Sequence, residues 1–102
     1  MDRSRLYESY YILRSDLKDE ELKKSILDLK RKFDDLAIGI KKFEEIGVKN
    51  LAYEVMHQKQ GYFICVEFRA TADELVELER YCRIKDDILK YCVLKKYNRR
   101  TK

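Results

Sequence analysis

The stretch QGYFICVEFRATADELVELERYCRIKDDILKYCVLK, residues 60–95, decides the fold. Residues 62–68 alternate between two sets of side chains, which predicts a β-strand. Thr71 and Glu74 then form a capping box, the residue pair that marks the start of a helix. We expect this helix to run to about Cys82, because its apolar residues recur at helical spacing.

The same stretch ends in a second strand. The polar run over 83–87 predicts a turn, and 88–95 predicts a strand that is rich in Ile, Leu, Tyr and Val. Residues 96–102 are predicted to be a basic, flexible C-terminal tail, so the folded domain is expected to cover 1–95.

The chain before this stretch predicts a strand followed by a helix. Residues 6–14 are rich in Tyr, Ile and Leu and lack helical periodicity. Asp16 is the expected helix cap, and three acidic residues follow where the helix dipole favours anions. The apolar stripe of this helix is then Leu22, Ile26, Leu29, Phe33 and Leu36.

Between the two helices the spacing predicts two further strands. An irregular strand is expected from 37 to about Val55, with a bulge or bend at Gly47. The polar residues 57–61 are expected to form a hairpin loop to the strand over 62–68.

The order strand, helix, strand, strand, helix, strand defines an α+β fold class. Two right-handed βαβ crossovers place both helices on one face of a four-stranded antiparallel sheet. This is the ferredoxin-like, split βαβ sandwich, β-α-β-β-α-β. The other face of the sheet is expected to be uncovered. Because this fold supports many functions, the function must be argued from the site.

Composition excludes several classes of protein. The 102 residues carry a net charge of +4, and no apolar run approaches the roughly 20 residues that span a bilayer. No signal peptide is recognised. The three cysteines lack CxxC spacing, which favours a reducing cytoplasm over a disulfide framework. Residues 95–102 hold five cations and no acid, so residues 1–94 sum to about −1. A polyanion must therefore be bound by locally arranged cations.

The sequence offers no enzyme chemistry. His57 is the single histidine, it lies in a polar loop, and a general base needs an orienting partner. No catalytic, metal-binding or phosphate-cradling motif is present, so neither a metal nor a cofactor is expected. An acyl phosphate hydrolase on this fold would need such a phosphate loop. Stacking of bases as in the RNA-recognition motif is also disfavoured, because Ile64 stands where a ring is required.

Four stretches carry a resemblance that covers nearly the whole chain: YESYYILRSDLKDEEL (7–22), VKNLAYEV (48–55), QGYFICVEF (60–68) and LERYCRIKDDILKYCVLK (78–95). In this order and spacing they resemble the family of protein six of the bacterial small ribosomal subunit. The resemblance implies a cytoplasmic, non-catalytic constituent of the small ribosomal subunit. It implies binding to the central domain of 16S ribosomal RNA jointly with ribosomal small-subunit protein eighteen, which supports platform assembly and translation.

The resemblance also implies two sets of contact residues. The RNA-binding candidates are Arg5, Lys49, Arg83, Lys85 and Lys90. The candidates for contact with the protein partner are Leu51, Ala52, Tyr53, Tyr62 and Ile64.

The chain departs from the family pattern at three places and leaves an alternative open. Asn50 replaces a second cation before Leu-Ala-Tyr, while Ser15 and Glu54 stand where proline is common. The basic tail either adds RNA contacts or is solvated. The alternative is a free-standing ferredoxin-like domain that senses a small ligand or forms homodimers.

Overall fold

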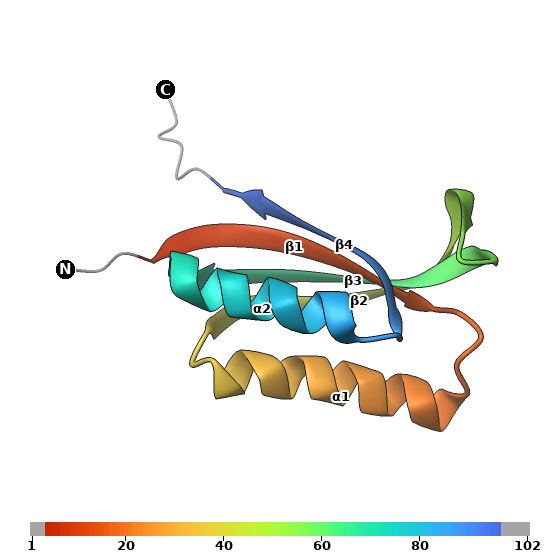
Figure 1. Cartoon of the computed structure of the whole chain (residues 1–102), viewed down its shortest axis with the longest axis horizontal. Coiled ribbons are helices and arrows are strands. Elements are labelled where there is room, and N and C mark those ends of the chain that lie inside the picture. Colours follow the sequence, from red (N-terminus) through yellow and green to blue (C-terminus); the bar gives the residue numbers. More distant parts are fainter. Residues whose placement is uncertain (1–3, 97–102) are drawn as a thin grey trace.

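The predicted order of elements is confirmed by the computed structural model, which describes residues 4–96 (Figure 1). The elements are β1 (Arg5–Arg14), α1 (Asp19–Asp35), β2 (Gly39–Val55), β3 (Gln58–Ala70), α2 (Ala72–Ile84) and β4 (Ile88–Lys95). Residues 83 and 84, which were expected in a turn, extend α2 instead.

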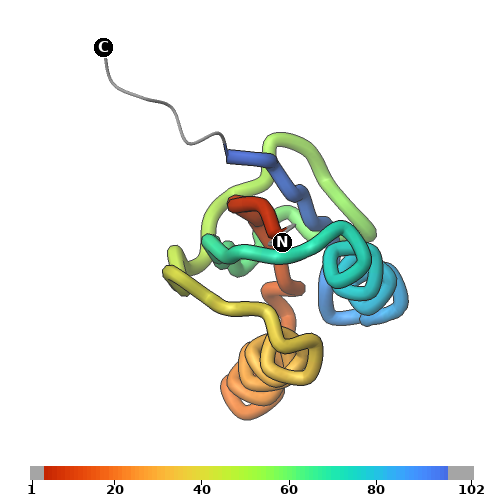
Figure 2. The backbone as a smooth tube through the Cα atoms, turned by 90° about the vertical axis from the view of Figure 1, so that its left-hand side faces the viewer, coloured from red at the N-terminus to blue at the C-terminus, as the bar shows by residue number. Residues whose placement is uncertain are grey.

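The four strands form one antiparallel sheet in the order β2-β3-β1-β4. In the central pair, Arg5 lies opposite Ala70 and Arg14 lies opposite Gly61. Both helices lie on the same side of the sheet, as Figure 2 shows nearly end-on. The predicted split βαβ sandwich is therefore confirmed, and β2 and β4 are its two edges.

The core lies between the helices and the covered face of the sheet. The covered face buries Tyr11, Leu13, Ile64, Val66 and Phe68, and α1 contributes Ile26, Leu29 and Phe33. The rings of Phe33 and Phe68 meet edge to face, with centroids 5.1 Å apart. An aromatic pair of this kind is worth about 0.5–1.5 kcal/mol beyond the area it buries.

The starts of the two helices are built differently. Thr71 caps α2 as predicted: its hydroxyl accepts from the N–H of Glu74 at 3.2 Å, and the Glu74 carboxylate accepts from the N–H of Thr71 at 2.9 Å. The prediction for α1 was wrong, because Lys18 and not Asp16 is its cap residue. A lysine side chain cannot accept a hydrogen bond. Only the Glu21 carboxylate caps this end, by accepting from the N–H of Lys18.

The connection between β2 and β3 is tighter than the sequence suggested. The predicted loop 57–61 was wrong: Gln58–Gly61 already belong to β3, and the turn consists of Met56 and His57. Both turn residues have positive φ, at 48° and 65°. This is the signature of a type I′ turn, whose twist matches the flanking strands. The expected bulge at Gly47 is confirmed by a register shift between Glu45 and Gly47.

Lys96, the first residue of the predicted tail, continues the sheet. Its N–H donates to the carbonyl of Leu6 at 2.8 Å, and its ammonium lies 2.9 Å from the Glu67 carboxylate. The rest of the predicted tail, 97–102, lies outside the described residues. Among residues 4–96, neither helix combines the length and the apolar character that crossing a membrane requires.

Candidate nucleic-acid interface

Three of the five predicted RNA-binding cations come together at one pocket. Arg83 lies in the last turn of α2, Lys85 follows that helix, and Lys90 lies on β4. All three line a pocket of about 350 Å³ between the end of α2, β4 and the tip of the β2–β3 hairpin. The end of α2, the residue after it and the start of β4 thus gather cations that the overall charge of the domain does not provide.

The other two predicted cations lie elsewhere. Arg5 pairs with Ala70 at one end of the sheet, whereas the pocket adjoins the other end, where Ile88 pairs with Leu13. Eight residues of strand separate the two places by roughly 26 Å. Lys49 pairs with Gly61 on the β2 edge, three strand spacings or about 14 Å from β4. These five residues therefore do not form one compact site.

Lys85 is held in the groove between the two helices. Its ammonium lies 3.7 Å from the Asp28 carboxylate and 5.7 Å from the centre of the Tyr81 ring, above which Lys32 also lies. Burial and the nearby Asp28 charge raise the pKa of Tyr81 to about 12. Partly exposed ion pairs are worth under about 1 kcal/mol, so a phosphate could compete for this lysine.

Arg83 is the least engaged of the three cations. Its side chain is exposed, and no ion pair within residues 4–96 involves it. A planar guanidinium in that state is suited to bind a phosphate with two parallel hydrogen bonds.

Lys90 connects the predicted RNA residues to the predicted partner residues. Its ammonium donates to the Tyr53 hydroxyl at 2.7 Å and lies 5.0 Å from the centre of the Tyr53 ring. This hydrogen bond and the lysine charge hold the pKa of Tyr53 below its ordinary value. The two predicted sets of residues are thus adjacent at this point.

Tyr53 reaches β4 because the end of the hairpin leaves the ladder. The register of β2 with β3 runs to Asn50 opposite Gln60 and resumes only at Val55 opposite Gln58. Residues 51–54 therefore leave the ladder and curl toward the uncovered face of the sheet, where the hairpin end projects from the body (Figures 1 and 2). Asn50 is bonded to the side chain of Gln60, at 3.0 Å.

Two predicted partner residues lie on the wrong face of β3. Ile64 has no exposed surface and belongs to the core, so it cannot contact a partner. Tyr62 faces the same side, is half-buried, and donates its hydroxyl to Glu45 at 2.6 Å, which raises its pKa to about 12. By alternation, Phe63 and Cys65 are the β3 side chains of the uncovered face. The set with Tyr62 and Ile64 is the more apolar of the two, and this difference indicates that it faces the core.

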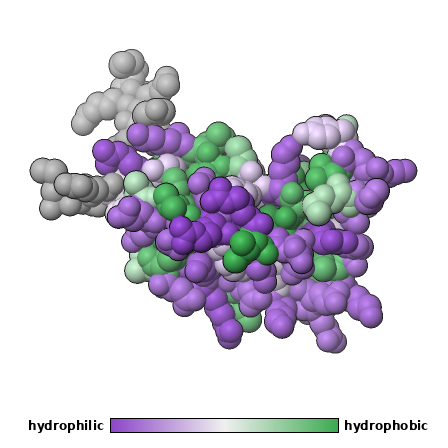
Figure 3. Space-filling model, viewed as in Figure 1, coloured by the Kyte–Doolittle hydropathy of each residue, from purple (hydrophilic) through white to green (hydrophobic). Residues whose placement is uncertain are grey.

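The uncovered face is mixed in character. Its strands bring together Tyr10, Ile12, Phe63, Leu94 and, directly opposite one another, Glu8 and Glu67. Lys96 pairs with Glu67 and lowers the pKa of that carboxyl. On the side drawn in Figure 1, where α2 lies in front of the sheet, the hydrophobic residues likewise form small groups among hydrophilic ones (Figure 3).

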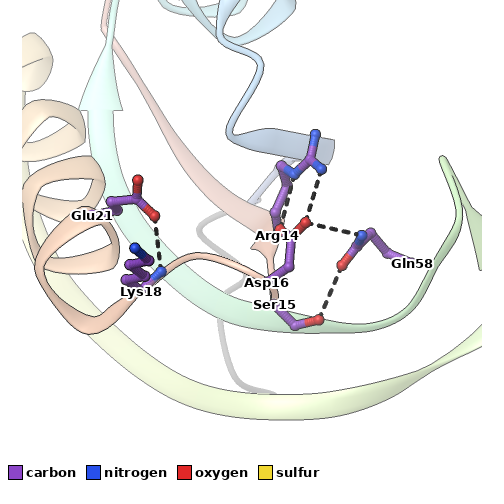
Figure 4. Close-up of polar contacts among 6 residues, drawn as sticks. All are labelled: Arg14, Ser15, Asp16, Lys18, Glu21 and Gln58. Atoms are coloured by element: carbon purple, nitrogen blue, oxygen red, sulfur yellow. Dashed lines mark hydrogen bonds and ion pairs between the residues drawn. The ribbon is translucent and has the colours of Figure 1, made fainter.

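A polar network ties Gln58, which follows the Met56–His57 turn, to the residues at and after the end of β1 (Figure 4). Arg14 donates two hydrogen bonds to the Asp16 carboxylate, at 3.1 and 3.0 Å, and Gln58 donates to the same carboxylate at 3.4 Å. The Ser15 hydroxyl donates to Oε1 of the Gln58 side chain at 3.2 Å. The arginine lowers the pKa of Asp16, and the turn after β1 is tied to the first residue of β3.

Gly61 completes the placement of the hairpin. A Cβ at this position would overlap Cγ2 of Ile12 and lie 3.5 Å from Cδ2 of Leu51. The missing side chain lets Leu51 pack over β3. Sequence reasoning missed this role and also that of Met56 at the turn, whose side chain is 64% exposed and lines the pocket.

Comparison with known proteins agrees with this architecture. The family model described as ribosomal protein S6 matches residues 6–95. Small ribosomal subunit protein bS6 of Helicobacter pylori (strain ATCC 700392 / 26695) is 37% identical over 91 residues, which are 89% of this chain and 64% of that protein. The bS6 protein of Caldanaerobacter subterraneus is 35% identical over 89% of this chain and 96% of its own length.

A solved structure is similar as well. The crystal structure of 30S ribosomal protein S6 from Thermotoga maritima superimposes with a TM-score of 0.85 at 26% identity. The match covers 91% of this chain and 88% of that one.

Proposed function

Because the chain belongs to the ribosomal protein S6 family, whose members are structural components of the small ribosomal subunit and not enzymes, we propose that it binds the central domain of 16S ribosomal RNA jointly with ribosomal small-subunit protein eighteen. In this role it supports assembly of the platform and thereby translation. The expected location, the cytoplasmic ribosome, and the expected lack of catalysis agree with family membership.

The RNA-binding part of the proposal is supported by the pocket cations. Arg83, Lys85 and Lys90 line one pocket of a domain whose charge is otherwise nearly balanced. Cations placed in this way fix the register of a protein on the phosphate backbone, and their binding weakens steeply as salt is added. Arg5 and Lys49 would contribute only to an RNA that extends along the sheet.

The partner part is supported by the hairpin end and the uncovered face. Leu51, Ala52 and Tyr53 lie in the part of β2 that leaves the ladder with β3, and Tyr53 is 62% exposed. Apolar and aromatic groups with a polar rim are typical of protein interfaces. With Ile64 excluded, Phe63 and Leu94 of the uncovered face are the better candidates to extend this surface.

One observation carries the joint binding: Lys90 donates to Tyr53 at 2.7 Å. A partner that covers Tyr53 would border directly on RNA held at Lys90. Each ligand would then meet a surface that the other has helped to order, which favours binding both together. A free-standing ligand sensor or homodimer gains no comparable support.

The test is a titration of a central-domain 16S RNA fragment with this protein, with and without protein eighteen, at 50 and 200 mM salt. We expect tight binding only with the partner and a steep loss of affinity at the higher salt concentration. Arg83→Gln and Lys90→Gln should each reduce the slope of log affinity against log salt concentration by about one.

Lys23→Gln is the matched control, because Lys23 is exposed on α1 and does not line the pocket. This substitution also removes one positive charge, but it should leave the slope nearly unchanged. Equal effects of all three substitutions would refute the pocket as the RNA site. A homodimer in isolation, with no RNA binding under either condition, would favour the free-standing domain.

A further inference from the structure

The pocket at the end of β4 has an apolar wall and a cationic rim. Met56, Leu89 and Tyr91 supply apolar surface, while Arg83, Lys85 and Lys90 supply three positive charges. Asp86 is the single acid that lines it. This combination differs from a plain phosphate patch, which needs cations but no apolar wall.

A bulge opens the edge of the sheet at this place. Ile12 pairs with Lys90 and Leu13 pairs with Ile88, so Leu89 has no partner in the ladder. A bulge bends the strand and redirects the side chain of its extra residue. Here it leaves Leu89 beside the tip of the hairpin, where the pocket forms.

The backbone of β4 adds polar groups to the same edge. The N–H of Lys96 bonds to Leu6, and paired residues of an antiparallel ladder alternate between bonded and non-bonded positions. By that alternation, the N–H and C=O of Tyr91 point away from β1. One donor and one acceptor are thus available next to the apolar wall.

We propose that this pocket receives a single unstacked nucleotide of RNA, with its base against Met56, Leu89 and Tyr91 and its phosphate at Arg83 and Lys90. The inference rests on the proposed function and specifies what the site binds. Proteins recognise RNA sequence mostly at unpaired bases, which pack on apolar or aromatic side chains while cations bind the phosphates.

The size and the charge of the pocket favour this occupant. At about 350 Å³ it lies at the small end of ligand pockets, so it admits one nucleotide rather than a helix. An apolar side chain of a protein partner would fill the wall and leave three cations opposite one acid. A nucleotide satisfies both parts at once.

Photo-crosslinking from Met56 tests the proposal in the complete complex. Met1 and Met56 are the only methionines, so photo-methionine is introduced at two positions. The labelled protein is assembled with protein eighteen and the central-domain RNA, irradiated, and mapped by primer extension. We expect one strong stop at an unpaired nucleotide, and its loss in Met56→Leu.

A second measurement separates the failure of this proposal from the failure of the proposed function. RNA affinity is compared for Arg83→Gln and Lys23→Gln, and circular dichroism verifies that both fold. We expect Arg83→Gln to bind the RNA severalfold more weakly. Its crosslinks from Met56 should no longer fall at a single nucleotide. Normal RNA binding with no crosslink from Met56, or a crosslink to protein eighteen instead, would overturn the nucleotide pocket alone. Failure of the complex to bind RNA would overturn the proposed function and, with it, the pocket.

Discussion

Replacing Gly61 with alanine should destabilise both the sheet and the packing of the hairpin end. The added Cβ overlaps Cγ2 of Ile12, and its nearest other neighbours are the Leu13 carbonyl oxygen at 3.4 Å and Cδ2 of Leu51 at 3.5 Å. The isoleucine methyl is a branch at Cβ rather than a flexible chain end, so it cannot move without a change of rotamer.

The magnitude follows from two opposing effects. Overpacking of this kind costs about 1–3 kcal/mol. Alanine recovers roughly 0.5–1 kcal/mol of the conformational entropy that glycine loses on folding. The two ranges differ by about 0–2.5 kcal/mol, so we expect Gly61→Ala to lower the free energy of unfolding by about 1 kcal/mol, which corresponds to a fall of up to about 1 M in the urea midpoint.

Gly39→Ala is the control, because a Cβ at Gly39 meets nothing within 4 Å and the backbone there is not left-handed. Its stability should be unchanged or slightly raised. The assay is urea unfolding followed by circular dichroism, with affinity for protein eighteen measured in parallel. Equal midpoints for the two variants would refute the argument that Gly61 accommodates Ile12 and Leu51.

Three further predictions concern stability. Tyr11→Phe should leave the thermal midpoint unchanged or raise it, since the buried Tyr11 hydroxyl has no hydrogen-bond partner within residues 4–96; a clear fall would contradict this. Thr71→Ala should cost about 1 kcal/mol in denaturant unfolding by removing the cap of α2, and a loss near zero would show that the capping box contributes nothing. Arg14 holds the pKa of the Asp16 carboxyl below its ordinary value, so the pair stabilises the fold above that ordinary value, near pH 4, and loses its effect as pH falls through the lowered pKa. Titration of Asp16 by NMR should show a pKa that moves toward the ordinary value in Arg14→Gln, and an unaltered low pKa would exclude the arginine as its main cause.

Features set by local chemistry were predictable from the sequence. The alternation over 62–68, the capping box at Thr71 and the boundaries of β4 all depend on neighbouring residues, and each is confirmed. The stripe of α1 likewise identified the side chains that meet the sheet.

Features set by competition between distant residues were not predictable. Asp16 is a good cap on local grounds, but its carboxylate accepts from the neighbouring Arg14 and from Gln58, which is 42 residues away. The Met56–His57 turn carries no glycine or asparagine, so pairing of the flanking strands and not turn chemistry determines it.

The candidate site shows the same division. Resemblance identified the cations at the end of α2 and the Leu-Ala-Tyr segment, but not that Lys90 and Tyr53, 37 residues apart, are in contact. The alternation over 62–68 does not say which of its two faces the helices cover, and burial excludes Ile64 from the interface.

Sedimentation in cell extract tests the central claim most directly. The protein is tagged, the extract is fractionated on a sucrose gradient at low salt, and its distribution is compared with those of 16S RNA and protein eighteen. We predict that it travels with the small subunit and is released as the salt concentration rises. A protein that remains at the top of the gradient while protein eighteen sediments with the subunit would contradict the account.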